Sequence, residues 1–159
     1  VRPTRHSYRL IKESGEFVIN LTPASLIRAA DYCGMYTGAK VDKFKETGLT
    51  RADAQVVACP LIAECPLALE CRVLSVLPQG THDLFLAEVV AVDVDESIVD
   101  ANGKLRMDRA GLAAFAHEEY FELGRRIGVF GFSAAKKHGG KKPAAGAKTG
   151  KPVPGVKKQ

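Results

Sequence analysis

The chain has 159 residues, 46% hydrophobic and 26% charged, which is enough for one domain with a real core. No run approaches the roughly 18 apolar residues of a membrane helix, and the opening Val-Arg-Pro-Thr-Arg lacks a signal peptide's apolar core. The net charge is +5, but eight of the 23 Lys and Arg residues lie from Lys136 onward, leaving 15 basic against 18 acidic residues before it. That distribution argues against a nucleic-acid groove. We therefore expect a soluble cytoplasmic protein without a membrane or nucleic-acid partner.

The first half of the chain mixes helix and strand signals. Helices are predicted over 4–14, from Thr22-Pro23 to Gly34 and over 41–47, with a strand over 16–21. Thr4 is the expected N-cap of the first helix, and Gly15 is its stop. The strand follows from the alternation of Phe17, Ile19 and Leu21.

The second half is expected to be richer in strands. The predicted elements are an irregular edge region over 56–66, strands over 67–77 and 84–94, a helix over 108–123 and a terminal strand or extended segment over 125–132. Pro60 and Pro66 do not fit a central strand, and the turn over 78–83 indicates an antiparallel hairpin. Because 84–94 is apolar on both faces, we expect the fold's interior to cover one face and helices or a partner subunit the other. The helix depends on the spacing of Leu112, Phe115, Ala116 and Phe121.

Two further features concern the tail and the cysteines. Residues 136–159 are mostly Lys, Gly, Ala and Pro, which predicts a disordered tail after a single domain over 1–135. The cysteines are Cys33, Cys59, Cys65 and Cys71. None has the Cys-x-x-Cys spacing of a metal knuckle, so we expect no metal and mostly buried, reduced thiols.

Basic and hydroxyl side chains gather where the first helix begins. They are Arg2, Thr4, Arg5 and Ser7. A helix N-terminus offers free N–H groups and a positive dipole end, and guanidinium groups bind phosphate in a bidentate manner. The pattern is consistent with an anion site or with a capped, solvated helix start that carries surface arginines.

Short sequence blocks through residues 1–135 follow one another in an order that is typical of one family. They lie at 1–8, 15–21, 32–34, 37–44, 46–50, 69–71, 80–85, 123–125 and 131–133. With these blocks the chain resembles the flavin reductase family, especially its flavoredoxin-like branch. The resemblance implies a mainly β fold with helices, an FMN-binding split β-barrel of Greek-key topology, and a homodimer that binds FMN at or near the subunit interface. Because the family has further strands before the position of Val1, we expect a barrel truncated at its N-terminus.

The resemblance also implies which residues contact the ligands. The expected FMN-binding residues are Arg2, Thr4, Arg5, Ser7, Asn20, Cys33 and Lys43. Lys43 would neutralise phosphate charge, unless it is an ordinary surface lysine. Cys33 would be a packed thiol beside the flavin rather than a redox partner. His82 is the candidate for the nicotinamide pocket, with an exposed turn histidine as the alternative.

The implied activity is NAD(P)H-dependent reduction of FMN, with electrons passed to free flavin or to an acceptor protein. FMN carries the hydride chemistry, so the lack of a nucleophile or general-base constellation in the sequence fits this expectation. One alternative is an FMN-binding electron carrier without its own NAD(P)H site. Another is a protein that binds nucleic acid or an acidic partner through its lysine tail.

Overall fold

The computed structural model describes residues 1–134 and divides the chain into two units, Val1–Arg126 and a second unit that starts at Ile127. The tail expected over 136–159 lies outside the described residues. In the described part of the second unit, turns close from Phe132 N to Val129 O and from Ala134 N to Gly131 O. Of the two alternatives for 125–132, the strand is wrong, because no strand pairs with this stretch within residues 1–134 and the chain turns from Val129 onward.

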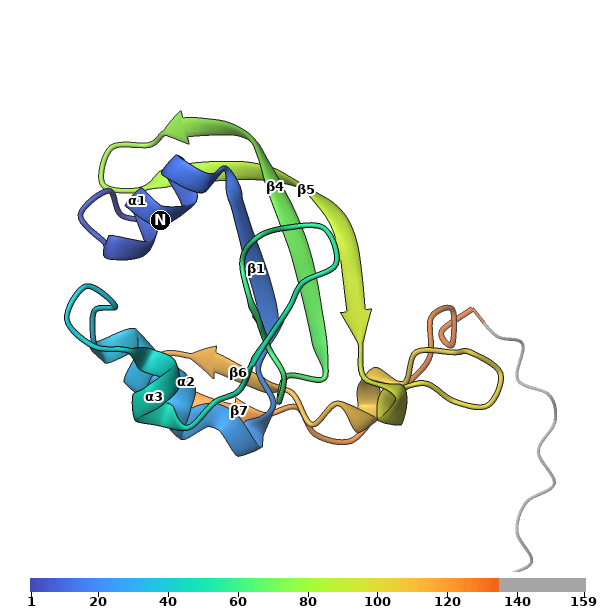
Figure 1. Ribbon diagram of the computed structural model, residues 1–159. Coiled ribbons are helices and arrows are strands. Elements are labelled where there is room, and N and C mark those ends of the chain that lie inside the picture. The colour runs from blue at the N-terminus through green and yellow to red at the C-terminus, as the bar shows by residue number, and fades with distance from the viewer. Residues whose placement is uncertain (135–159) are drawn as a thin grey trace, which may run out of the picture. The chain divides into compact units, whose positions relative to one another are not determined.

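A three-stranded antiparallel sheet forms the centre of the first unit (Figure 1). Its order is β1 (Glu16–Leu21), β4 (Leu67–Pro78), β5 (Asp83–Val94). In its register Phe17 lies opposite Cys71, and Ala68 lies opposite Asp93. The strands predicted over 16–21, 67–77 and 84–94, and the hairpin that joins the last two, are confirmed.

Helices lie on the chain before and after β1. They are α1 (His6–Ser14), the 3-10 turn Ala24–Leu26, α2 (Ile27–Met35) and α3 (Lys43–Thr47). The predicted helices are present, but α1 starts after residue 4 and its N-cap is Arg5, not Thr4. Pro3 favours a tight turn that closes from Arg5 N to Arg2 O at 3.0 Å, and this turn takes up Thr4. Among residues 1–134 no helix has the length and apolarity to cross a bilayer.

Residues 50–62, here called the crossing segment, run over one face of the central sheet (Figure 1). The segment contains β2 (Arg51–Ala52) and β3 (Leu61–Ile62), which pair with each other. Between them it is irregular, as the prolines predicted for 56–66. Its contacts with the sheet come mainly from backbone N–H groups that donate to side chains of β1 and β4, and the Gln55 side chain donates to Asp93 of β5.

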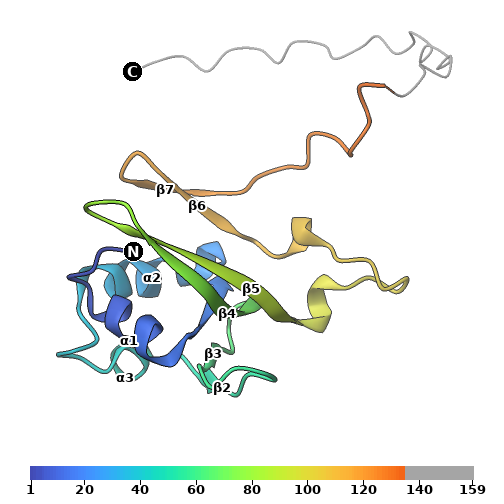
Figure 2. The same ribbon diagram turned by 90° about the horizontal axis from the view of Figure 1, so that it is seen from above.

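The end of the first unit is a hairpin, seen from another side in Figure 2. It follows the 3-10 turns Glu96–Ile98 and Met107–Arg109 and consists of β6 (Ala113–Ala116) and β7 (Glu119–Glu122). The helix predicted over 108–123 is wrong. Gly111 has a φ of 57°, and Ala113 N donates to Thr22 O at 3.1 Å, so tertiary pairing draws this stretch into an extended conformation.

A hydrophobic cluster lies on the other face of the central sheet, where Leu67, Ile98 and Ala110 are buried and Leu21, Leu69 and Leu112 pack against them. Val57 and Leu61 of the crossing segment are buried as well. The fold class, mainly β with helices, is confirmed, but the strands of residues 1–134 form no closed barrel. On β5 the side chains of Leu84, Leu86, Val89 and Val92 are about half exposed in the single chain, so the cover expected from a partner subunit stays a prediction.

The four cysteines are free thiols. Cys71 is buried and the other three are half-buried, so the expectation of mostly buried thiols holds fully only for Cys71. Burial raises the pKa of Cys59, Cys65 and Cys71, with further increases from Glu16 at Cys59 and Glu64 at Cys65. These three thiols therefore stay protonated at neutral pH. No group of metal-ligating side chains occurs within residues 1–134.

Candidate anion-binding site

An open hollow of about 670 Å³ lies between the start of α1 and the segment that joins α2 to α3. It is lined by Thr4, Arg5, His6, Ser7, Leu10, Cys33, Gly34, Tyr36, Thr37, Gly38 and Lys43. Five of the seven residues predicted to bind FMN are in this lining: Thr4, Arg5, Ser7, Cys33 and Lys43. Residues from two distant parts of the sequence thus meet at one place.

The start of α1 forms one side of the hollow. The turn that closes from Arg5 N to Arg2 O sets the direction of the helix, and Gly15 ends it with a φ of 70°. The first N–H groups of an α-helix have no partner within the helix, and they lie at the positive end of its dipole. Arg5 and Ser7 add a guanidinium and a hydroxyl at this end, so this side of the hollow favours an anion.

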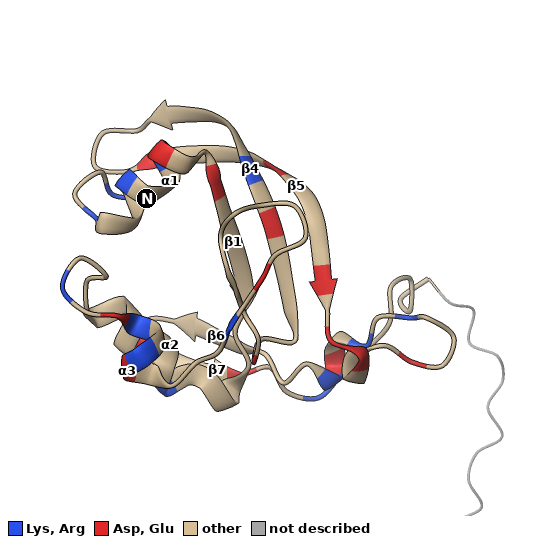
Figure 3. Ribbon diagram, in the orientation of Figure 1, with Lys and Arg blue, Asp and Glu red and all other residues tan. Residues whose placement is uncertain are grey.

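Lys43 forms the opposite side. Asp42 caps α3 by accepting from Phe44 N at 3.1 Å and Lys45 N at 3.3 Å, which fixes the first turn that carries Lys43. The Lys43 ammonium donates to the carbonyl oxygen of Cys33. Figure 3 shows Lys and Arg both at the start of α1 and on α3. The hollow is therefore flanked by cationic side chains from two elements.

Sequence reasoning missed some lining residues. His6 lies between Arg5 and Ser7, and a Cβ on Gly38 would be 3.5 Å from its ring. The ring therefore lies against the loop before α3. Thr37 and Gly38 fall in the family-like sequence block at 37–44, so the loop itself could be recognised from the sequence. Its contact with the start of α1 depends on the path of the loop.

Asn20 lies at a second, smaller pocket of about 280 Å³ with a mainly apolar lining. Its Oδ1 accepts from Ile62 N at 3.0 Å, so this side chain holds the crossing segment. Cys33 lines both the pocket and the hollow. Asn20 is thus near the hollow without being part of its lining, and Cys33 separates the two spaces.

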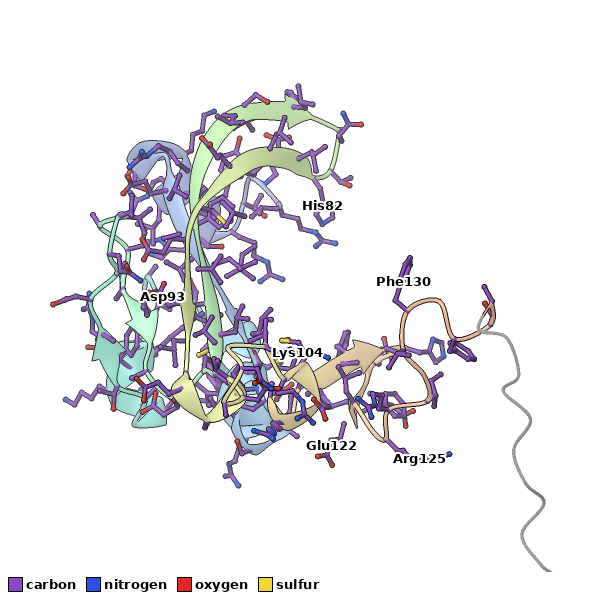
Figure 4. All side chains as sticks on the ribbon, turned by 90° about the vertical axis from the view of Figure 1, so that its right-hand side faces the viewer. His82, Asp93, Lys104, Glu122, Arg125 and Phe130 are labelled. Atoms are coloured by element: carbon purple, nitrogen blue, oxygen red, sulfur yellow. The ribbon has the colours of Figure 1, made fainter. Side chains whose placement is uncertain are left out.

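His82 and Arg2 pair with each other at the tip of the β4–β5 hairpin (Figure 4). Arg2 Nε donates to His82 Nε2 at 3.2 Å, so Nε2 is the acceptor. This assigns the proton to Nδ1, which lies 3.0 Å from the hydroxyl of Thr81. Both side chains are exposed, and neither is among the residues that line the hollow.

The donor set of the hollow fits the phosphate of a nucleotide cofactor. It combines Arg5, Lys43, hydroxyls such as those of Thr4 and Ser7, and a helix N-terminus, all of which favour phosphate. Its volume is within the roughly 300–1,000 Å³ of small-molecule sites. The hollow therefore has the charge and the size for such a ligand.

The chain is similar to proteins of other organisms. The flavin reductase like domain family matches residues 1–123. An uncharacterized protein of Archaeoglobus fulgidus is 35% identical over 97 residues, which cover 61% of this chain and 55% of that protein. The chain thus spans about half the length of this relative.

Solved structures show the same fold. Flavoredoxin of Desulfovibrio vulgaris (Miyazaki F) aligns over 85% of this chain and 73% of its own, with a TM-score of 0.79 and 30% identity. A Shewanella frigidimarina protein named for a flavin reductase with a split barrel domain aligns over 81% of this chain and 67% of its own, with a TM-score of 0.71 and 20% identity. The fold of the described residues is therefore that of the flavin-reductase-like split barrels, and the chain belongs to the flavin reductase like domain family.

Proposed function

We propose that the chain binds FMN with its phosphate in the hollow and takes part in NAD(P)H-dependent flavin reduction. The observation that carries this proposal is the meeting of Thr4, Arg5, Ser7, Cys33 and Lys43 around one hollow. The family resemblance of the sequence predicts FMN contacts for the same five residues. The family match and the flavoredoxin likeness support the same class of ligand.

The residues of the chain bind and orient. Arg5 supplies a bidentate contact to phosphate oxygens, and Lys43, held by the Cys33 carbonyl, supplies a point charge from the other side. The hydroxyls of Thr4 and Ser7 add neutral donors. When bound, FMN supplies hydride transfer, so the protein needs no nucleophile of its own.

A second candidate function is that of an FMN-binding electron carrier, which receives electrons from another protein instead of NAD(P)H. It is favoured by the hydrogen bond between Arg2 and His82, because this bond engages the side chain that the family resemblance assigns to the nicotinamide pocket. We place this function second because the family match names reductases.

We further propose that the active form is a homodimer. The exposed apolar side chains of β5 support it. So do Phe115 and Phe121 of the last hairpin and Leu123 directly after the hairpin, which are 51–64% exposed. An acceptor protein that takes electrons from FMN would compete for the same kind of surface. Sedimentation with and without FMN measures the oligomeric state directly.

Titration of the purified chain with FMN and with riboflavin tests the proposal. Riboflavin lacks the phosphate, so we expect FMN to bind more tightly and Arg5→Gln to remove most of that difference. Arg9→Gln is the matched control, since Arg9 lies on α1 outside the lining. Equal affinity for FMN and riboflavin would contradict a phosphate site.

The reductase part needs a separate measurement. Under anaerobic conditions NADH or NADPH should bleach the visible bands of the FMN complex. Bleaching by dithionite but not by either nicotinamide cofactor would favour the electron carrier. No binding of FMN at all would overturn both functions.

A further inference from the structure

A buried carboxylate lies under the crossing segment, away from the hollow. The side chain of Glu70 on β4 is fully buried. It accepts hydrogen bonds from Gln55 N at 2.7 Å, Val56 N at 2.8 Å and Val57 N at 2.9 Å. Three consecutive backbone amides of the crossing segment are therefore held by one side chain.

Asp93 on β5 lies beside Glu70. In the register of the sheet Asp93 is opposite Ala68, which places it on the same face as Glu70 and diagonal to it. Figure 4 shows Asp93 on the side of β5 that the crossing segment covers. Its Oδ1 accepts from Gln55 Nε2 at 2.6 Å, so both carboxyl groups contact the same residue of the segment.

The second carboxylate oxygen of Asp93, Oδ2, is buried and lacks a hydrogen-bond donor among the described residues. A buried carboxylate oxygen without a donor is unfavourable, and so is a negative charge next to the fully buried carboxylate of Glu70. One proton on this pair removes both problems, because an Asp93 O–H can donate to Glu70.

The bonding capacity of Glu70 allows this. Its Oε1 accepts only the Gln55 amide, so one acceptor site on that oxygen is unused among the contacts described above. Burial raises the pKa of Glu70, but the three backbone donors and the neighbouring Asp93 side chain outweigh it and leave that pKa below its ordinary value. Within the pair, Glu70 therefore favours the charged form.

Other charged side chains on the surrounding elements are Glu16 of β1, Arg72 of β4, Glu88 of β5, Asp95 after β5, and Arg51, Asp53 and Glu64 in or next to the crossing segment. Arg72 pairs with Glu16 at 3.3 Å, and Asp95 and Glu64 accept from Ser97 N and Thr50 N. No cation among residues 1–134 forms an ion pair with Glu70 or Asp93. A proton is therefore what balances the pair.

We propose that Glu70 and Asp93 share one proton and act as a pH-dependent latch, which holds residues 55–57 on the sheet and releases them when the proton leaves. The direction follows from charge. As pH rises, the shared proton is lost and the two carboxylates repel each other. The hydrogen bonds that hold the side chain and the amide of Gln55 then weaken. Because Ile62 and Cys65 line the small pocket beside the hollow, release of the segment also loosens a wall next to the site.

Amide hydrogen exchange of the complete chain between pH 6 and pH 9 tests the latch, with each rate divided by the intrinsic rate at that pH. We expect protection of Gln55, Val56 and Val57 to fall at least about tenfold over this range. The amides of Phe44 and Lys45, which Asp42 holds without a second carboxyl group, serve as an internal reference. Protection of residues 55–57 that stays constant to pH 9 would overturn the proposal.

Asp93→Asn separates the shared proton from the shape of the site. Asparagine keeps an acceptor for Gln55 Nε2 and carries a permanent N–H donor for Glu70, so we expect its protection to be independent of pH. Glu88→Gln on the exposed face of β5 is the control and should behave like the unmodified chain. If amide protection in Asp93→Asn fell with pH in the same way as in the unmodified chain, no shared proton would be involved.

Discussion

The phenol of Tyr8 donates a hydrogen bond of 2.6 Å to Oδ2 of Asp83, which ties α1 to the first residue of β5. Asp83 is nearly buried, and its backbone also exchanges two hydrogen bonds with Val1. This carboxylate raises the pKa of Tyr8, so the phenol stays protonated and remains a donor. The start of the chain, α1 and the β4–β5 hairpin are thus held together at one residue.

Removal of that hydroxyl should therefore be felt by the whole unit. We expect Tyr8→Phe to lower the free energy of unfolding by about 1 kcal/mol, because it leaves a nearly buried carboxylate with one donor fewer. Urea denaturation measures this. Tyr36→Phe is the control, since Tyr36 is 53% exposed, and an equal loss in both variants would contradict a special role for the Tyr8–Asp83 bond.

The role of Lys43 can be tested with its neighbour on α3. We expect Lys43→Met to weaken binding of FMN by roughly tenfold, the loss of about one charge-assisted hydrogen bond, and to leave riboflavin binding unchanged. Lys45→Met removes an exposed charge that does not line the hollow and should change neither affinity. A parallel loss for FMN and riboflavin in Lys43→Met would mean that Lys43 supports the fold and not the phosphate.

Two glycines of the helices should respond in opposite ways to alanine. Gly15 ends α1 with a φ of 70°, so Gly15→Ala should destabilise the chain by about 1 kcal/mol. Gly34 lies within α2 and a Cβ there meets nothing within 4 Å, so Gly34→Ala should stabilise by about 0.5–1 kcal/mol. Thermal unfolding of both variants checks the sign of each change. Destabilisation by Gly34→Ala would show that this position requires a residue without a side chain.

Acid should remove the contribution of one ion pair. Arg106 donates two hydrogen bonds to Asp108, at 2.9 and 2.7 Å, and lowers the pKa of Asp108 to about 2. A lowered folded-state pKa contributes stability above the unfolded pKa of about 3.9, and that contribution is lost as the pH falls toward 2. Asp108→Asn should therefore be less stable than the unmodified chain at pH 6, with a gap that closes by pH 2. A gap of the same size at both values would contradict this linkage.

The sequence predicts the central strands well because their pattern is local. Phe17, Ile19 and Leu21 alternate, and the turn before Asp83 marks the hairpin, so strand limits agree within one residue. The last hairpin could not be found in this way. Its two turn residues, His117 and Glu118, have positive φ values without being glycine, and its extended form depends on pairing with the segment at Thr22.

The candidate site is only partly readable from sequence for a related reason. Arg5 and Ser7 were visible as a cluster at a helix start, and the family resemblance pointed to Lys43. The approach of His6 to Gly38 depends on the path of a loop. Glutamate is usually a surface residue, and only the folded sheet shows that Glu70 is buried beneath three amides.

The hydrogen bonds that hold the crossing segment also limit where residues can be inserted into or deleted from this protein. Four amides in a row, from Gln55 to Ala58, meet acceptors fixed on β4 and β1, and Ile62 meets Asn20 further on. One inserted or deleted residue between Gln55 and Ile62 would shift these donors away from acceptors that cannot follow. Although it has the irregular backbone of a loop, this stretch should keep a constant length among close homologues, and variation in length should fall in connections such as Asp100–Lys104.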